Sequence, residues 1–330
     1  MWRWVRWLAP LVVLIVLALV FRDQMPFLGD SVRRLRDASP WGVLAAVLAS
    51  AGSLVAMAEV MRLLLGAGGT HVLLRHTTAI TLASNSVSTT LPGGPAFSAV
   101  LTYQVQRSWG ASRLLCGWFF VLSSAVSTMW LVVIGVAGVF FLGARVNVWS
   151  LLLTLTLMTA LSWAVWWAAN HPDSLERGAR GLVPRLNRLL GRDRDTGMEA
   201  LVRQIRQLES VRLSRGRFAL VAGGSLLNRV FDALTLFLCV WAVTGSAPAV
   251  AGVLLAYTTA KLAGSAQVTP GGVGTVEAAI IATLVAAGMT AVDATGAALV
   301  YRIVSFVLVA AVGWVIYFLH YARKGVRASG

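Results

Sequence analysis

The residues most able to carry chemistry are ionisable side chains inside long apolar stretches. At bilayer depth such a side chain costs about 2.5–3.5 kcal/mol on insertion scales, so it usually faces a cavity or a partner. The residues of this kind are Glu59, Arg62, Arg229, Asp232, Lys261, Glu277 and Arg302. We therefore take these positions as the first candidates for a site that handles a charged ligand.

Four of these side chains form two pairs that are close in the sequence. Glu59 precedes Arg62 by three residues, and Arg229 precedes Asp232 by three. On a helix this spacing places both members of a pair on one face. Each pair either neutralises itself and only eases insertion, or takes part in a site. Asn85 is a weaker candidate, because amides in membrane helices often only link one helix to another.

The other three charged residues, Lys261, Glu277 and Arg302, have no partner nearby in the sequence. One of them could neutralise another across the fold. We predict that Arg229, Lys261 and Arg302 line a cavity and attract a lipid phosphate, with Glu277 as the counter-charge or coupling group. The sequence contains neither a metal-ligand spacing nor a Walker motif, so no metal or cofactor is expected.

The apolar path is broken twice by the same triplet, at Pro92-Gly93-Gly94 and at Pro270-Gly271-Gly272. With 9 Pro and 31 Gly among 330 residues, chance gives roughly 0.08 such triplets, so two copies indicate an internal repeat. Small and hydroxyl residues precede both triplets. We expect the same local structure, and a related role, at both breaks.

A Pro-Gly-Gly triplet can end one half-helix and begin another. Proline lacks the N–H that a helix needs, and glycine supplies positive φ. Broken backbone persists in a membrane only where protein or a wet cavity satisfies its polar groups. The next half-helix then presents free N–H groups and a positive dipole end, which suit an anion. The alternative is two kinked helices that only pack tightly.

The second break also resembles a known family. The run from Pro270 to Glu277, with Gly274 inside it, is similar to the P-G-G-x-G-x-x-E signature of the flippase-like transmembrane region of lysylphosphatidylglycerol synthases. Tyr301-Arg302 fits the basic position in that family's last helix. The likeness covers about residues 40–320. It implies a lipid-translocating fold with two re-entrant hairpins.

The first break departs from the family pattern. Pro95, Ala96, Phe97 and Ser98 follow it, where such proteins often carry a glycine and an acid. We therefore expect cargo control at the second break before the first. The resemblance further implies a stand-alone member without the aminoacyltransferase domain. Its implied cargo is an anionic or aminoacylated phospholipid, or a polyprenyl-phosphate lipid.

The elements that would position these residues follow from composition. The chain is 58% apolar and 12% charged, with a mean hydropathy of +0.76, far from the usual soluble composition. Segments of 10–16 residues are more often re-entrant or core helices than spans, whereas about 20 apolar residues cross a bilayer. The apolar segments are roughly 7–22, 41–65, 77–91, 114–142, 147–169, 218–243, 249–264, 275–289 and 292–319.

The predicted fold is an all-α polytopic membrane protein with about six spanning helices and two re-entrant helical hairpins in an inverted repeat. One transmembrane domain would occupy residues 1–330. Its first half is 7–169, with a break at 92–95, and its second half is 218–320, with a break at 270–274. A loop at 170–217 separates them and holds eleven Arg against six acids.

Arginine placement predicts the orientation. The loop just described and both chain ends are rich in arginine, and cytoplasmic loops carry an excess of basic residues. We therefore expect both termini on the cytoplasmic side of the inner membrane of a bacterium. The formal net charge of +15 lies in short loops, so it does not indicate nucleic-acid binding.

The function expected from these features is a lipid flippase or carrier, and not an enzyme. Membrane lipids with anionic headgroups are the expected ligands, and a homo-oligomer or a lipid-synthesis enzyme is the expected protein partner. Two alternatives stay open. One is an intramembrane transferase acting on a polyprenyl-phosphate sugar, and the other is a membrane assembly partner without transport activity.

Overall fold

The computed structural model describes residues 38–141, 214–265 and 269–322, and within these ranges the chain is helical and contains no strand. Four helices are long and apolar enough to cross a membrane. They are α3 (Pro40–Ala67), α6 (Arg113–Phe141), α10 (Arg215–Thr244) and a continuous helix from Ala291 to Tyr321. The predicted segments outside the described residues are 7–22, 147–169 and nearly all of 170–217.

Four predicted spans are confirmed as helices of spanning length, namely 41–65, 114–142, 218–243 and 292–319. Their composition explains them. Each is almost free of charge over an 18-residue window, so only lipid or other helices can surround it. The helix starts are also encoded locally. The Ser39 hydroxyl accepts from the Gly42 N–H at the start of α3, and Pro40 stands in its first turn.

Shorter helices surround the two breaks. The first break separates α4 (Leu74–Thr90) from α5 (Gly94–Ser108). The second separates α11 (Val250–Ser265) from α12 (Thr275–Ala286), and a single helical turn at Pro270–Gly272 lies between them. The helix α5 was not among the predicted apolar segments, because Gln104, Gln106 and Arg107 dilute its hydropathy.

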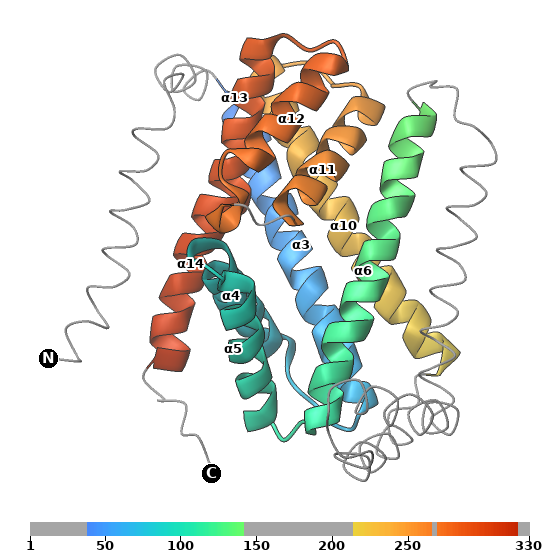
Figure 1. Ribbon diagram of the computed structural model, residues 1–330, viewed down its shortest axis with the longest axis vertical. Helices are drawn as coiled ribbons and strands as arrows, with labels where there is room; N and C mark the ends of the chain where they lie inside the picture. The colour runs from blue at the N-terminus through green and yellow to red at the C-terminus, as the bar shows by residue number, and fades with distance from the viewer. Residues whose placement is uncertain (1–37, 142–213, 266–268, 323–330) are drawn as a thin grey trace, which may run out of the picture.

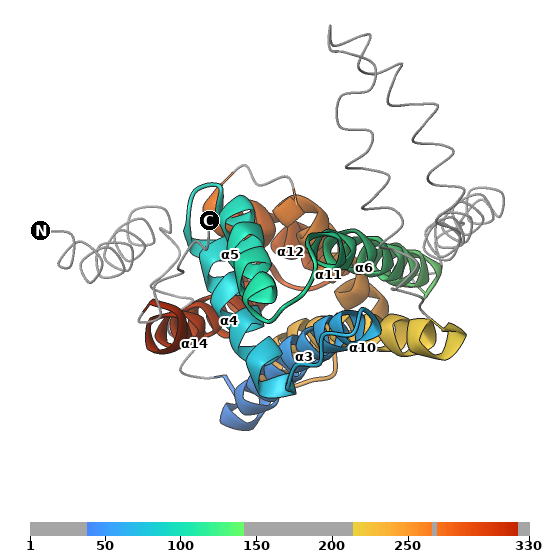
Figure 2. The same cartoon turned by 90° about the horizontal axis from the view of Figure 1, so that it is seen from below.

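The helices α3 and α10 pack along their lengths and form one side of the fold (Figure 2). Small residues let them come close. A Cβ added to Gly42 would lie 2.7 Å from the Cβ of Ala242. Further along, the Asn228 amide donates to the Ser53 carbonyl and hydroxyl, at 2.9 Å each. Close backbone approach and interhelical hydrogen bonds are the usual means of helix association in lipid.

The last helix becomes π-helical twice. It begins as α13 (Ala291–Arg302), becomes π-helical over Ile303–Leu308, continues as α14 (Val309–Ile316), and is π-helical again over Tyr317–Ala322. π-Helical turns are rare and often occur at functional sites. Here the first one starts directly after Arg302, one of the predicted site residues.

The two helical hairpins approach each other from opposite ends of the molecule. In Figure 1, α11 and α12 occupy the upper half, α4 and α5 the lower half, and both connecting turns lie near mid-height. Figure 2 shows α4 and α5 close together on the side away from α10. Direct contact between α4 and the Pro270–Gly272 turn confirms that the two breaks meet.

Candidate functional site

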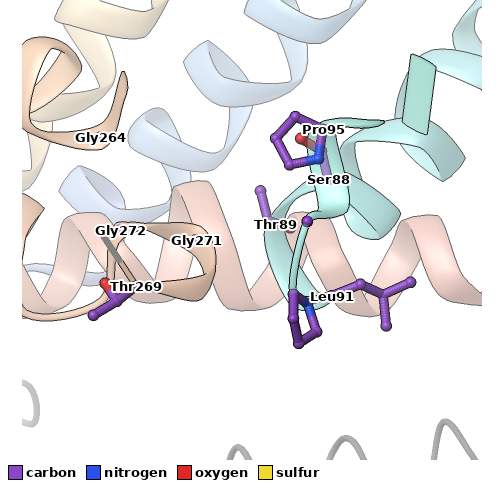
Figure 3. A pocket seen from close by; sticks show the side chains of 10 residues that line it. Ser88, Thr89, Leu91, Pro95, Gly264, Thr269, Gly271 and Gly272 are labelled. Carbon is purple, nitrogen blue, oxygen red and sulfur yellow. The ribbon is translucent and has the colours of Figure 1, made fainter. Parts of the chain in front are cut away.

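A cavity of about 330 Å³ lies where the two breaks meet (Figure 3). Its wall combines hydroxyl side chains, prolines and glycine backbone from both triplets. It therefore places hydroxyl residues and glycine backbone together in a fold whose long helices are apolar. The lining residues are Ser88, Thr89, Leu91, Pro92, Gly93, Pro95, Gly264, Thr269, Gly271 and Gly272.

The first break turns sharply because each of its residues favours leaving the helix. Leu91 is extended, as the residue before proline prefers, and Gly93 takes φ of 66° before α5 begins. Gly94 must be glycine for another reason. An added Cβ there would lie 2.3 Å from the Ser88 carbonyl oxygen and 2.5 Å from that of Val87. The turn thus folds back tightly on the end of α4.

The second break presses its backbone against the first. Gly271 has φ of 61°, and an added Cβ would lie 2.6 Å from the Thr89 carbonyl oxygen and 2.3 Å from the Phe306 ring. Gly272 and Gly274 also have positive φ. The contact between the breaks is therefore made by main chain, and only glycine fits at its centre.

The second break is held by a buried ion pair. Arg302 donates from Nε to Glu277 Oε1 at 2.6 Å and from Nη2 to Oε2 at 3.1 Å. The same guanidinium donates to the Gly271 carbonyl at 3.1 Å and to the Gly272 carbonyl at 2.7 Å. Arg302 is 6% exposed and Glu277 is 5% exposed. The arginine thus replaces the hydrogen bonds that the broken backbone has lost.

The two half-helix N-termini differ in a way that the sequence foreshadowed. At α12, Glu277 bends back so that its Oε2 accepts from the Gly274 N–H at 2.8 Å. Its carboxylate therefore occupies the anion position of its own helix. The N-terminus of α5 carries neither an acid in its first turn nor a side-chain cap. The missing acid at the first break leaves this helix end uncovered beside the cavity.

A second polar group connects α10, α11 and α13. Asp232 accepts the ammonium group of Lys261 in a salt bridge. The Tyr257 hydroxyl donates to Asp232 Oδ2 at 3.4 Å, and the Tyr301 hydroxyl donates to Oδ1 at 3.5 Å. The ammonium group also lies 5.4 Å from the centre of the Tyr257 ring. Each oxygen of the carboxylate therefore has a tyrosine donor, and Oδ2 also contacts the lysine.

Arg229 joins this group from the other side. It donates from Nη2 to the Ser127 hydroxyl of α6 at 2.6 Å and from Nη1 to the Tyr257 hydroxyl at 3.4 Å. Its Nε is buried and has no hydrogen-bond partner among the described residues. We call Arg229, Asp232, Tyr257, Lys261, Tyr301 and Ser127 the basic cluster.

The predicted site residues therefore fall into three places. Pro92, Gly93, Gly271 and Gly272 line the cavity, while Gly94 and Gly274 shape the turns beside it. The basic residues do not gather in one place as expected. Arg302 binds Glu277 and the backbone of the second break, whereas Arg229 and Lys261 belong to the basic cluster. None of these three residues lines the cavity. Pro270 opens the helical turn of the second break.

The remaining candidates belong neither to the cavity wall and its turns, nor to the ion pair at the second break, nor to the basic cluster. Glu59 and Arg62 form an exposed bidentate pair on α3, with the arginine side chain 43% exposed. This geometry agrees with the self-neutralising interpretation. Asn85 lies on α4, half-buried, and its carbonyl accepts from the Thr89 hydroxyl at 2.9 Å. Its side chain has no role that the described contacts reveal.

Sequence reasoning missed the neutral members of the basic cluster and the ring that packs on the second break. Ser127 and Tyr257 look like ordinary residues of apolar helices, and no spacing rule links α6 to α11. Tyr301 was visible only as the neighbour of Arg302. Phe306 stacks 5.1 Å from the Arg302 guanidinium, four residues along the helix, and this spacing was a detectable signal.

The chain also matches a known protein family. The family model described as lysylphosphatidylglycerol synthase TM region matches residues 6–313. The match starts well before residue 40, where the sequence resemblance began, so it also includes the first apolar segment. No curated protein matches the chain.

Proposed function

Because the chain belongs to the family of the lysylphosphatidylglycerol synthase transmembrane region, and is a multi-pass membrane protein, we propose that it is a lipid carrier. Its cargo would be an anionic or aminoacylated phospholipid, or a polyprenyl-phosphate-linked lipid. It would move this lipid across the cytoplasmic membrane of a bacterium without chemical change. A lipid-synthesis enzyme would supply the cargo.

The observation that carries the proposal is the cavity between the two breaks. Hydroxyl residues such as Ser88 and glycines from both triplets line a space of about 330 Å³ in an otherwise apolar helical fold. Such a space favours a polar headgroup, while acyl chains can stay outside in the lipid.

The arrangement of the hairpins supports alternating access to that cavity. In the proposed topology, α4–α5 enters from the cytoplasm and α11–α12 from outside, as two re-entrant hairpins of an inverted repeat. Carriers of this type place their substrate near the membrane midplane, between discontinuous helices. The chain termini would then be cytoplasmic, in agreement with the arginine distribution.

The test is lipid translocation in proteoliposomes. Fluorescent-tail analogues of an anionic phospholipid are placed in both leaflets, and a membrane-impermeant quencher is added outside. The measured rate is that at which lipid of the inner leaflet moves to the outer leaflet and is quenched. The wild-type protein should accelerate exchange over protein-free vesicles. The variant Gly271→Ala should slow it by about tenfold, because its Cβ forces the two breaks apart.

The matched control is Gly117→Ala, a second glycine-to-alanine change in a described helix. An added Cβ at Gly117 meets nothing within 4 Å, so this variant should translocate at the wild-type rate. A wild-type rate equal to that of empty vesicles, with every lipid class tested, would refute the carrier proposal. It would favour the membrane assembly partner.

A further inference from the structure

The basic cluster contains more positive than negative charge. Arg229 and Lys261 contribute two cations, and Asp232 contributes the one carboxylate that the described contacts give it. The formal sum is +1. The ion pair of Glu277 and Arg302, in contrast, sums to zero and uses every donor group of the arginine. An unbalanced charge inside a membrane protein usually marks a ligand site.

The lysine in this cluster can leave its carboxylate without stranding it. Each oxygen of Asp232 keeps a tyrosine hydroxyl, from Tyr257 and Tyr301 respectively. The Lys261 side chain is also 32% exposed, compared with 7% for the Arg302 side chain. A half-exposed ammonium on a flexible stem can exchange one anionic partner for another at modest cost.

The arginine has a donor that is still free. Its Nη1 and Nη2 are held by Tyr257 and Ser127, which fix the guanidinium plane, while the buried Nε of Arg229 has no partner among the described residues. A buried donor without a partner costs about 1–3 kcal/mol, so it is a strong incentive for an acceptor to bind. An acceptor placed there would lie beside a fixed positive charge.

The basic cluster also shares the helix α11 with the wall of the cavity. Lys261 precedes Gly264 by three residues on α11, and Gly264 lines the cavity. Residues at this spacing share one side of a helix. Lys261 therefore lies on the same side of α11 as a residue of the cavity wall.

We propose that the basic cluster binds the phosphodiester group of a lipid that carries a single negative charge. One non-bridging oxygen would accept from Arg229 Nε, and the other would take Lys261 from Asp232. Such a ligand brings the formal charge of the cluster to zero. This inference rests on the proposed carrier function and narrows its cargo to monoanionic phosphodiesters.

Charge counting excludes the other lipid classes from tight binding. A zwitterionic headgroup brings a third cation toward Arg229 and Lys261, and a lysylated phosphodiester carries a net positive charge into an already positive site. A dianionic phosphomonoester leaves an excess negative charge. Like charges without a partner are costly at low dielectric, so the preference for one negative charge should be strong.

The experiment measures lipid binding to the full-length protein in detergent, by competition against a fluorescent phosphatidylglycerol. Phosphatidylglycerol should displace the probe about tenfold better than phosphatidylcholine or lysylphosphatidylglycerol. Lys261→Gln should remove this preference, and Lys261→Arg should restore most of it. Arg217→Gln, an exposed charge on α10 outside the cluster, should leave it unchanged.

A variant whose lipid preference shifts, instead of being lost, excludes misfolding as the cause of the change. Asp232→Asn raises the formal charge of the cluster to +2, so its preference should shift toward phosphatidic acid, whose phosphomonoester carries up to two charges. Glycerophosphoglycerol, the headgroup without acyl chains, separates the two sources of a phosphodiester. Competition by this soluble compound at the lipid's own concentration would contradict a lipid site.

Two results would overturn the inference: equal displacement by phosphatidylglycerol and phosphatidylcholine, or an unchanged preference in Lys261→Gln. Either result can occur in a protein that still translocates lipid in vesicles, and then the carrier function stands while the charge selection falls. Charge-selective binding without any translocation would support the charge selection and contradict the carrier function.

Discussion

At the scale of single residues, the pair of Glu277 and Arg302 explains how a broken helix persists in an apolar fold. Breaking the helix leaves the carbonyls of Gly271 and Gly272 without partners, and a bare carbonyl in an apolar environment is costly. One guanidinium satisfies both of them and the carboxylate together. The carboxylate in turn covers the start of α12.

Removing either partner of this pair should therefore be severe. We expect Arg302→Ala to lower the free energy of unfolding by about 3–5 kcal/mol, because it strands a buried carboxylate and two carbonyls. Denaturant titration in mixed micelles would measure the loss. The double variant Glu277→Gln with Arg302→Met should lose less than Arg302→Ala, since no lone charge remains. Equal stability of Arg302→Ala and the wild type would contradict the role given to Arg302.

The sequence revealed the charged members of both groups but not their pairing. Lys261, Glu277 and Arg302 stood out because charge is rare in apolar segments. Which cation meets which acid depends on how α12 and α13 cross α10 and α11, and no local spacing encodes that. The neutral donors Ser127 and Tyr257 carry no such signal at all.

At the scale of elements, α3 and α10 form a tight seam that positions everything else. Gly42 lies against Ala242, Gly52 against the Phe231 ring, and Gly224 against Val60. In lipid there is no hydrophobic drive between apolar helices, so such close packing supplies much of their association energy. The seam gives the basic cluster a firm base, because Arg229 and Asp232 both project from α10.

The seam should be sensitive to a single methyl group. Gly42→Ala would place a Cβ 2.7 Å from that of Ala242, and we expect a loss of about 1–3 kcal/mol in the free energy of unfolding. The control Gly223→Ala on α10 meets nothing within 4 Å, so it should be neutral or slightly stabilising. Thermal unfolding followed by tryptophan fluorescence would compare them. A more stable Gly42→Ala would show that the seam is looser than described.

The sequence predicted which segments form long helices. It predicted neither the π-helical turns nor α5, the more polar helix of the first hairpin. Long apolar runs predicted α3, α6 and α10 within a few residues, because the bilayer dictates their length. The helix α5 escaped prediction since it is partly polar. The π-helical turn at Ile303–Leu308 depends on how Arg302 and Phe306 reach the second break, which is a tertiary constraint.

At the scale of the whole molecule, the last helix backs both breaks. Phe306 and Arg302 pack on the second break. About two turns further along, Trp314 Nε1 donates to the Thr90 hydroxyl at 3.1 Å, and α14 packs on α4 beside the first break. The two hairpins therefore touch each other at their turns and share one supporting helix.

Locking the two turns together should stop transport. The double variant Leu91→Cys with Thr269→Cys places one thiol on each break, both lining the cavity. Cys116 and Cys239 are buried and should not react. A cleavable bifunctional maleimide should abolish translocation in vesicles, and reductive cleavage of its linker should restore it. The single variant Leu91→Cys should be unaffected by the same reagent. Full transport in the cross-linked protein would mean that the breaks need not separate.

The repeated triplet made the meeting of the two breaks conceivable from the sequence, and the family signature made the second break specific. Their contact through Gly271 and Thr89 could not be foreseen, because it depends on the length and tilt of four separate helices. The unequal ends of α5 and α12 were foreshadowed by the acid that the first break lacks.

The buried pair of Glu277 and Arg302 also constrains how the protein inserts into the membrane during its synthesis. Glu277 is synthesised 25 residues before Arg302, and α12 is only 12 residues long. Until the arginine emerges from the ribosome, a deprotonated Glu277 would face lipid alone at a cost of several kcal/mol. We therefore expect α12 to wait at the insertion machinery and to enter the bilayer together with the final helix, as one unit whose charges are already matched.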